Sequence, residues 1–111
     1  MIINKTTGKV ISQREMVCDS FFSQARGLML RGKRNLVMVF PSERKISLHM
    51  FFVFYAIDVL IVDSAMKIVE IKRNLKPFRV WNSSQKGKYV IELAGKGEYE
   101  IGDSIEIKKK N

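Results

Sequence analysis

The longest apolar stretch of the chain runs from Ser47 to Asp63, SLHMFFVFYAIDVLIVD, and the predicted core is organised around it. Ile46 to Phe54 is predicted to be a strand that is buried on both faces or partly bulged, because nearly every position is apolar. Ile57 to Val62 is predicted to be the next strand. The side chains from Met50 to Phe54 are therefore expected in the core, with His49 hydrogen-bonded to a neighbour on a buried strand.

Shorter apolar runs between turn residues predict the other strands. Met1 to Ile3 and Lys9 to Ile11 flank the turn-like cluster Thr6-Thr7-Gly8, which indicates a hairpin. Further strands are predicted over Leu36 to Phe40, Met66 to Ile71, Tyr89 to Leu93 and Ser104 to Lys108.

Polar and proline-containing segments predict where these strands end. Pro41 is expected to stop the strand before it, and Ser42 to Lys45 to form a polar turn. Leu75 to Trp81 is predicted to be a loop or an edge segment, because Pro77 has no N–H to donate to a central ladder. Asn82 to Lys88 is polar and is predicted to be a loop.

One short helix is predicted from Ser20 to Met29. Ser20 is an N-cap residue type, and Phe21, Phe22, Ala25, Leu28 and Met29 recur at helical spacing. Many short strands, frequent turns and a single helix indicate a mainly β domain, built as a compact sandwich or barrel. At 111 residues the whole chain, 1–111, is expected to form one domain.

Composition supports an ordinary globular core, with 46% hydrophobic and 28% charged residues. The lone cysteine, Cys18, excludes an internal disulfide and is expected to be a buried, slowly reacting thiol. No secretory leader is evident at the N-terminus, and the longest apolar run is too short to cross a bilayer. We therefore expect a cytoplasmic protein with no membrane association.

The net charge of +9 is unevenly distributed along the chain. Lys72 to Lys88 carries six basic residues and no acid, with aromatic side chains among them. Such segments bind single-stranded nucleic acid through phosphate neutralisation and base stacking. The alternative is a solvated basic edge with Trp81 packed on the core. The candidate residues for anion or nucleic-acid binding are Lys72, Arg73, Lys76, Phe78, Arg79, Trp81, Lys86 and Lys88.

Catalytic signatures are sparse. One histidine and one cysteine give no metal-ligand spacing, and no glycine-rich phosphate loop is present, so neither a metal nor a cofactor is expected. A Cys18–His49 nucleophile pair stays open, because such pairs meet in space rather than in sequence. Asp58 and Glu92 are a second open option, as carboxylates for acid–base catalysis.

Five segments stand out along the chain. They are RGLM at Arg26 to Met29 followed by Arg31, VMVFP at Val37 to Pro41, the stretch Leu48 to Asp58 with its HMFF and ID motifs, YVIELAG at Tyr89 to Gly95, and Gly102-Asp103. In this order they resemble the uncharacterised prokaryotic family called domain of unknown function 192. Ala56 stands where the family usually has proline. The resemblance implies a compact, mostly β domain similar to a jelly-roll sandwich, with no established activity.

The resemblance also marks a candidate polar site at motif positions, formed by Arg26, Arg31, His49 and Asp58. A buried charge without a partner is costly, so Asp58 is expected to pair with Arg26 or to accept backbone N–H groups from the RGLM turn. We expect a non-catalytic module that binds an anionic partner, with RNA as the leading candidate. The alternative is a small-molecule-binding protein or enzyme that uses a pocket near Arg26, His49 and Asp58.

Overall fold

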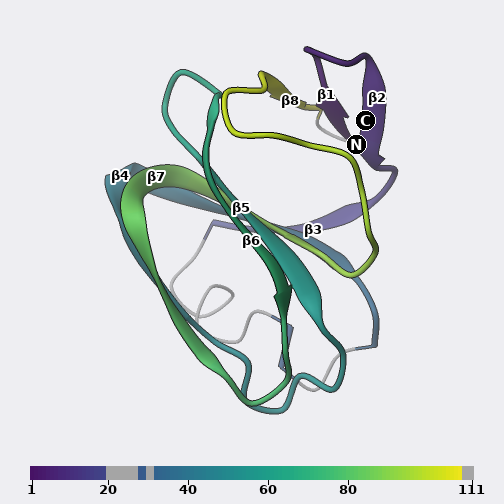
Figure 1. Ribbon diagram of the computed structural model, residues 1–111, viewed down its shortest axis with the longest axis vertical. Helices are drawn as coiled ribbons and strands as arrows, with labels where there is room; N and C mark the ends of the chain where they lie inside the picture. The colour runs from purple at the N-terminus through teal and green to yellow at the C-terminus, as the bar shows by residue number, and fades with distance from the viewer. Residues whose placement is uncertain (20–27, 30–31, 109–111) are drawn as a thin grey trace.

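Two β-sheets make up the part of the chain that the computed structural model describes, residues 1–19, 28–29 and 32–108 (Figure 1). The strands are β1 (Ile2–Asn4), β2 (Lys9–Ser12), β3 (Glu15–Cys18), β4 (Asn35–His49), β5 (Ile57–Val62), β6 (Ile68–Leu75), β7 (Val80–Leu93) and β8 (Ile105–Ile107). The small sheet has the order β2-β1-β8, and the large sheet has the order β3-β4-β7-β5-β6. Among the described residues neither sheet closes on itself, so the barrel alternative of the predicted sandwich or barrel is wrong, whereas the mainly β class is confirmed.

The core lies on both faces of the large sheet. On β5, Val59 and Ile61 belong to one buried cluster, and Leu60 and Val62 belong to the other. Because side chains alternate along a strand, a strand with both faces covered is apolar at every position. The second cluster also contains Ile2 and Ile105 of the small sheet, which therefore packs on that face.

Cys18, at the end of β3, is 2% exposed and lies in the first cluster. This agrees with the prediction of a buried thiol.

Two long strands, β4 and β7, correct the predicted strand ends. Pro41 lies inside β4, as does the segment from Ser42 to Lys45, and the segment from Asn82 to Lys88 lies inside β7. The β4–β7 pairing shifts register between Val39 and Arg44, so the ladder loses no hydrogen bond at Pro41. Polar residues are tolerated there because the side chains from Pro41 to Lys45 are exposed.

The apolar stretch after β4 is also corrected. The strand ends at His49 rather than at Phe54, and the chain turns at Phe51 and Phe52. Met50 and Val53 are buried, as predicted, but Phe51, Phe52 and Phe54 are 46%, 51% and 65% exposed. The prediction that the phenylalanines after His49 belong to the core is therefore wrong.

Most of the predicted helix, residues 20–27, falls outside the described residues. Leu28 and Met29, at its predicted end, form a turn. No helix occurs in the described ranges, and consequently none there could span a membrane.

Candidate functional site

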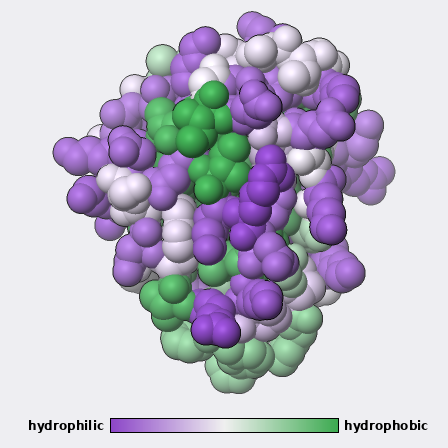
Figure 2. All heavy atoms as spheres, in the orientation of Figure 1, coloured by the Kyte–Doolittle hydropathy of each residue, from purple (hydrophilic) through white to green (hydrophobic). Residues whose placement is uncertain are grey.

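Four exposed phenylalanines lie at one end of the molecule, on the β4–β5 loop and the β6–β7 turn. We call Phe51, Phe52, Phe54 and Phe78 the aromatic surface. The Phe78 ring lies edge-on to Phe52 and Phe54, with ring centroids 6.2 and 5.6 Å apart, and His49 stacks on Phe51 at 5.3 Å. Figure 2 shows pale green spheres gathered at the lower end, where Figure 1 places the β4–β5 loop and the β6–β7 turn.

Long-range backbone hydrogen bonds build this surface. The carbonyl oxygen of Met50 accepts from the N–H of Phe78 at 2.8 Å and from the N–H of Val53 at 3.3 Å. The N–H of Met50 donates to the carbonyl of Arg79 at 2.7 Å. The loop after β4 is thereby fastened to the turn before β7, and Met50 is drawn into the core.

Two residues of the aromatic surface have left-handed backbone conformations, Phe52 with φ 58° and Phe78 with φ 60°. A bulky aromatic residue adopts this conformation at a cost of about 1–2 kcal/mol. Such strain persists where the surrounding structure imposes it, and it concentrates at functional sites. Here it coincides with side chains that face solvent.

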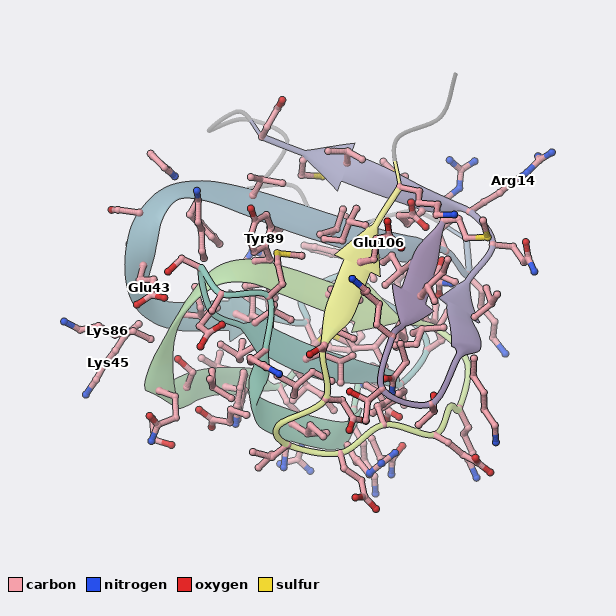
Figure 3. The ribbon with its side chains drawn as sticks, turned by 90° about the horizontal axis from the view of Figure 1, so that it is seen from above. Arg14, Glu43, Lys45, Lys86, Tyr89 and Glu106 are labelled. Atoms are coloured by element: carbon pink, nitrogen blue, oxygen red, sulfur yellow. The ribbon has the colours of Figure 1, made fainter. Side chains whose placement is uncertain are left out.

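Cations flank the aromatic surface. Lys76 and Arg79 are exposed on the β6–β7 turn, on either side of Phe78 in the chain. The other predicted bases lie elsewhere. Lys86 is opposite Lys45 across the β4–β7 ladder, near Glu43 at the far bend of these strands (Figure 3). Lys88 lies 5.7 Å from the centre of the Tyr89 ring.

Trp81 is half-buried. It pairs with Leu48 across the β4–β7 ladder and packs against the first core cluster. This packing agrees with the alternative prediction, in which Trp81 packs on the core.

Asp58 is a buried acceptor with three partners. Its Oδ1 accepts from the backbone N–H of Asn74 at 2.9 Å, and its Oδ2 accepts from the hydroxyl of Tyr99. Arg73 approaches Oδ2 at 3.5 Å and stacks over the Tyr99 ring at 4.7 Å. Burial, together with the adjacent Asp58 carboxylate, raises the pKa of Tyr99.

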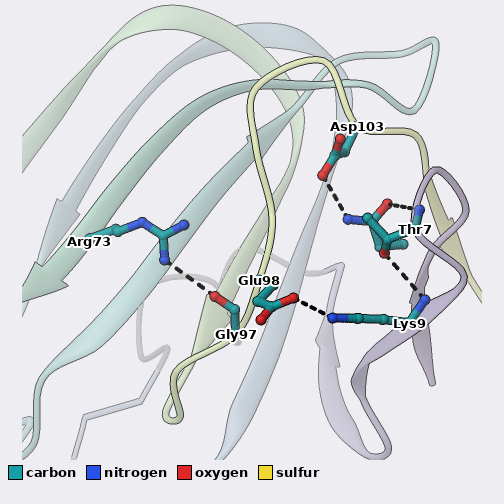
Figure 4. Close-up of polar contacts among 7 residues, drawn as sticks. Thr7, Lys9, Arg73, Gly97, Glu98 and Asp103 are labelled. Atoms are coloured by element: carbon teal, nitrogen blue, oxygen red, sulfur yellow. Dashed lines mark hydrogen bonds and ion pairs between the residues drawn. The ribbon is translucent and has the colours of Figure 1, made fainter.

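Arg73, one of the predicted nucleic-acid contacts, is thus tied to the fold. Its guanidinium also donates to the carbonyl oxygens of Gly97 and Tyr99 at 3.4 and 3.0 Å. Figure 4 shows the Arg73–Gly97 contact and, nearby, Asp103, which accepts from the side-chain amide of Asn4 at 2.7 Å. These bonds hold the loop after β7 against β6 and the β1–β2 hairpin.

The candidate polar site is only partly described. Arg26 and Arg31 lie outside the described residues, so the predicted Arg26–Asp58 pair is not tested. His49 is exposed and stacks on Phe51 of the aromatic surface, which corrects its predicted burial. Among the described residues it shares no ring contact or hydrogen-bond partner with Asp58. Because Cys18 is buried and His49 is exposed, the two side chains of the nucleophile-pair option face different surroundings.

Asp58 and Glu92 point to opposite faces of the large sheet. In the β5–β7 ladder Asp58 pairs with Leu93, and Glu92 pairs with Val59. Neighbouring residues alternate between faces, so the two carboxylates cannot act on one substrate. Among the described residues, no group of three or more His, Cys, Asp or Glu side chains could hold a metal ion.

Comparison with known proteins connects this geometry to a family. The model of DUF192, described as "Uncharacterized ACR", matches residues 2–107. The chain belongs to the DUF192 family. The earlier motif resemblance is thereby confirmed. The family carries no assigned activity, so its name adds no function to the geometry.

Relatives of this DUF192 protein include UPF0127 proteins of two archaea. The Thermococcus sibiricus protein is 43% identical, over 96% of this chain and 73% of its own. The Pyrococcus horikoshii protein is 34% identical, over 95% and 96%.

Two solved structures show the same fold. A "putative transcription regulator" from Sinorhizobium meliloti has a TM-score of 0.80 at 21% identity, and covers 95% of this chain and 88% of that chain. A protein of unknown function from Novosphingobium aromaticivorans has a TM-score of 0.76 at 20% identity, and covers 85% and 74%.

Sequence reasoning singled out Phe78 but missed the other rings of the aromatic surface. A signal was present in the spacing of Phe51, Phe52 and Phe54, which does not alternate as a half-buried strand would. The decisive contact, between the Met50 carbonyl and the Phe78 N–H, joins residues 28 positions apart and has no local signature.

Proposed function

We propose that this DUF192 protein is a non-catalytic binding module that takes single-stranded RNA on its aromatic surface. The observation that carries the proposal is the group of four exposed phenylalanine rings, held on two strained turns and flanked by Lys76 and Arg79. Exposed apolar groups of this kind mark interaction sites on soluble proteins.

The chemistry of the surface fits an unpaired polynucleotide. Unstacked bases gain about 1–3 kcal/mol each by stacking on aromatic side chains. The edge-on arrangement leaves ring faces of Phe52, Phe54 and Phe78 pointing in different directions, so successive bases can be accommodated. Lys76 and Arg79 supply positive charge for the phosphates, and the net charge of +9 attracts a polyanion from a distance.

Within the predicted basic segment, we assign the stacking role to Phe78 rather than to Trp81. Trp81 packs on the core, whereas Phe78 is 51% exposed, so Phe78 is the better platform. Arg73 is held by Asp58 and by two carbonyls, so Lys76 and Arg79 are better phosphate ligands than Arg73.

The test is fluorescence anisotropy of a labelled single-stranded RNA of about 12 nucleotides, within the range of sites on small binding domains. Phe78→Ala should weaken binding by about 1–3 kcal/mol, because one stacking platform is lost. The matched control is Ile101→Ala, since Ile101 is a 67% exposed apolar residue outside the aromatic surface.

Equal affinity of the wild-type protein and Phe78→Ala would contradict the proposal. The proposal would also be contradicted if Phe78→Ala weakened binding to anionic phospholipid vesicles but not to RNA, because a lipid surface would then be the partner. The melting temperatures of both variants should match that of the wild type, which separates a binding defect from a folding defect.

A further inference from the structure

A groove of about 910 Å³ lies between the two sheets, at the opposite end of the molecule from the aromatic surface. Figure 3 looks down on it and labels Tyr89 of β7 and Glu106 of β8, which line it from two sides. Its apolar lining comes from Val17, Val37, Val39, Met66, Ile105 and Ile107.

Glu15 contributes a buried carboxylate to the lining of the groove, and only one of its two oxygens is hydrogen-bonded within the described part of the chain. Its side chain is only 5% exposed, and it lines the groove from β3. One carboxylate oxygen, Oε2, accepts from the backbone amine of Met1 at 2.7 Å. The other, Oε1, is buried and has no hydrogen-bond partner among the described residues. A buried acceptor without a donor is costly, and native proteins rarely keep one without a use.

The charges around the groove indicate what kind of donor fits. The amine of Met1, Lys5 and Lys108 are positive, whereas Glu15 and Glu106 are negative. This small surplus of positive charge disfavours a cation beside Glu15, and the apolar lining disfavours an anion. A neutral N–H or O–H group satisfies Oε1 without either penalty.

We propose that the groove binds a neutral, largely apolar small molecule, whose single hydroxyl or N–H donates to Glu15 Oε1. The volume falls within the range of small-molecule sites, which combine an apolar lining with a few placed polar groups. The donor reaches Oε1 by a rotation of the carboxylate, a terminal torsion with broad preferences. This site is independent of the aromatic surface and does not rest on the RNA proposal.

The test uses two fluorescent probes on the native full chain. N-phenyl-1-naphthylamine is neutral and has one N–H, and its N-methyl analogue lacks the donor. The wild-type protein should bind the N–H probe about tenfold more tightly, as expected for one hydrogen bond to a charged acceptor. In Glu15→Leu the ratio of the two affinities should fall to about one, because the acceptor is gone. The N-methyl probe should still bind this variant.

Two further variants locate the site. Val39→Trp fills the groove and should abolish saturable binding of both probes. Phe54→Ser, on the aromatic surface, is the matched control and should leave both affinities unchanged. The preference ratio in Glu15→Leu decides the question even where Val39→Trp does not fold. Equal affinity of the wild type for the two probes, an unchanged ratio in Glu15→Leu, or loss of binding in Phe54→Ser would overturn the proposal.

Discussion

At the scale of single residues, Glu92 shows how far burial alone can change a side chain. It lies on β7 at 4% exposure, between Leu36 of β4 and Val59 of β5 in the ladders, and its Oε2 has no hydrogen-bond partner among the described residues. Burial raises the pKa of Glu92 to about 7. The protonated form is favoured because an isolated carboxylate is expensive to place in an apolar interior.

This pKa predicts that stability falls as pH rises. The unfolded chain loses the Glu92 proton near pH 4.5, whereas the folded chain keeps it until about pH 7. Between these values the folded state binds more protons, so the free energy of unfolding decreases with pH, by about 3 kcal/mol in all. Glu92→Gln should remove this slope and be the more stable protein at pH 8.

Urea denaturation at several pH values between 4 and 8 measures the effect, with each curve fitted for wild type and Glu92→Gln. The exposed Glu100→Gln is the control and should keep the wild-type slope. The contribution of Glu92 is the stability of the wild type minus that of Glu92→Gln at each pH. If this difference rose from about pH 4.5 to 7, Glu92 could not be a buried, protonated carboxyl.

At the scale of elements, β7 depends on a glycine where it crosses the sheet. A Cβ built on Gly87 would lie 2.3 Å from Cγ2 of Ile61 and 3.3 Å from the carbonyl oxygen of Val62. Ile61 is fully buried, so its methyl group has no space into which to move. Gly87 therefore lets β7 run close over β5 beside the register shift opposite Arg44.

Gly87→Ala is expected to destabilise the fold by about 1–3 kcal/mol, the usual cost of overpacking a filled core. Gly95→Ala is the matched control, because nothing lies within 4 Å of its Cβ position, and its stability should change little. Chemical denaturation gives both values. The cost should shrink in an Ile61→Ala background, and an undiminished cost there would show that the clash with Ile61 is not its cause.

At the scale of the whole molecule, charge governs binding to any polyanion. If about four of the exposed bases contact phosphates, the slope of log affinity against log salt should be about −3, from roughly 0.7 per contact on a single strand. Replacing both Lys76 and Arg79 by Ala should flatten this slope by one to two units, whatever the base sequence.

Titrations of RNA at several salt concentrations provide the slope. Lys5→Ala, on the β1–β2 connection at the other end of the molecule, is the control and should leave it unchanged. A slope that responds equally to Lys5 would place the RNA away from the aromatic surface and would attribute binding to the overall charge.

The mainly β class could be predicted because it depends on local composition. The strand from Ile57 to Val62 appears in the structure with the same ends, since an uninterrupted apolar run with turn residues after it has few other solutions. The hairpin at the N-terminus followed equally from apolar runs around a glycine-containing turn.

The candidate site was less accessible from the sequence. Pattern reasoning named Lys76, Phe78 and Arg79 from charge and aromatic content, and the structure leaves all three exposed. It placed the phenylalanines after His49 in the core, because hydrophobicity indicates a preference for burial but not which apolar residues obtain it. The partners of Asp58 could not be foreseen, because Arg73 and Tyr99 reach it from separate strands and loops.

By itself, the sequence determined the chain's family, its mainly β composition and its central buried strand, all of which depend on residue order and local pattern. Only the tertiary structure decided that β4 continues through Pro41, that Asp58 is held by Arg73 and Tyr99, and that four phenylalanines share one exposed surface. The physical reason is that each of these outcomes depends on hydrogen bonds and packing between residues far apart in the chain. The Met50 carbonyl that accepts the N–H of Phe78 is the plainest case.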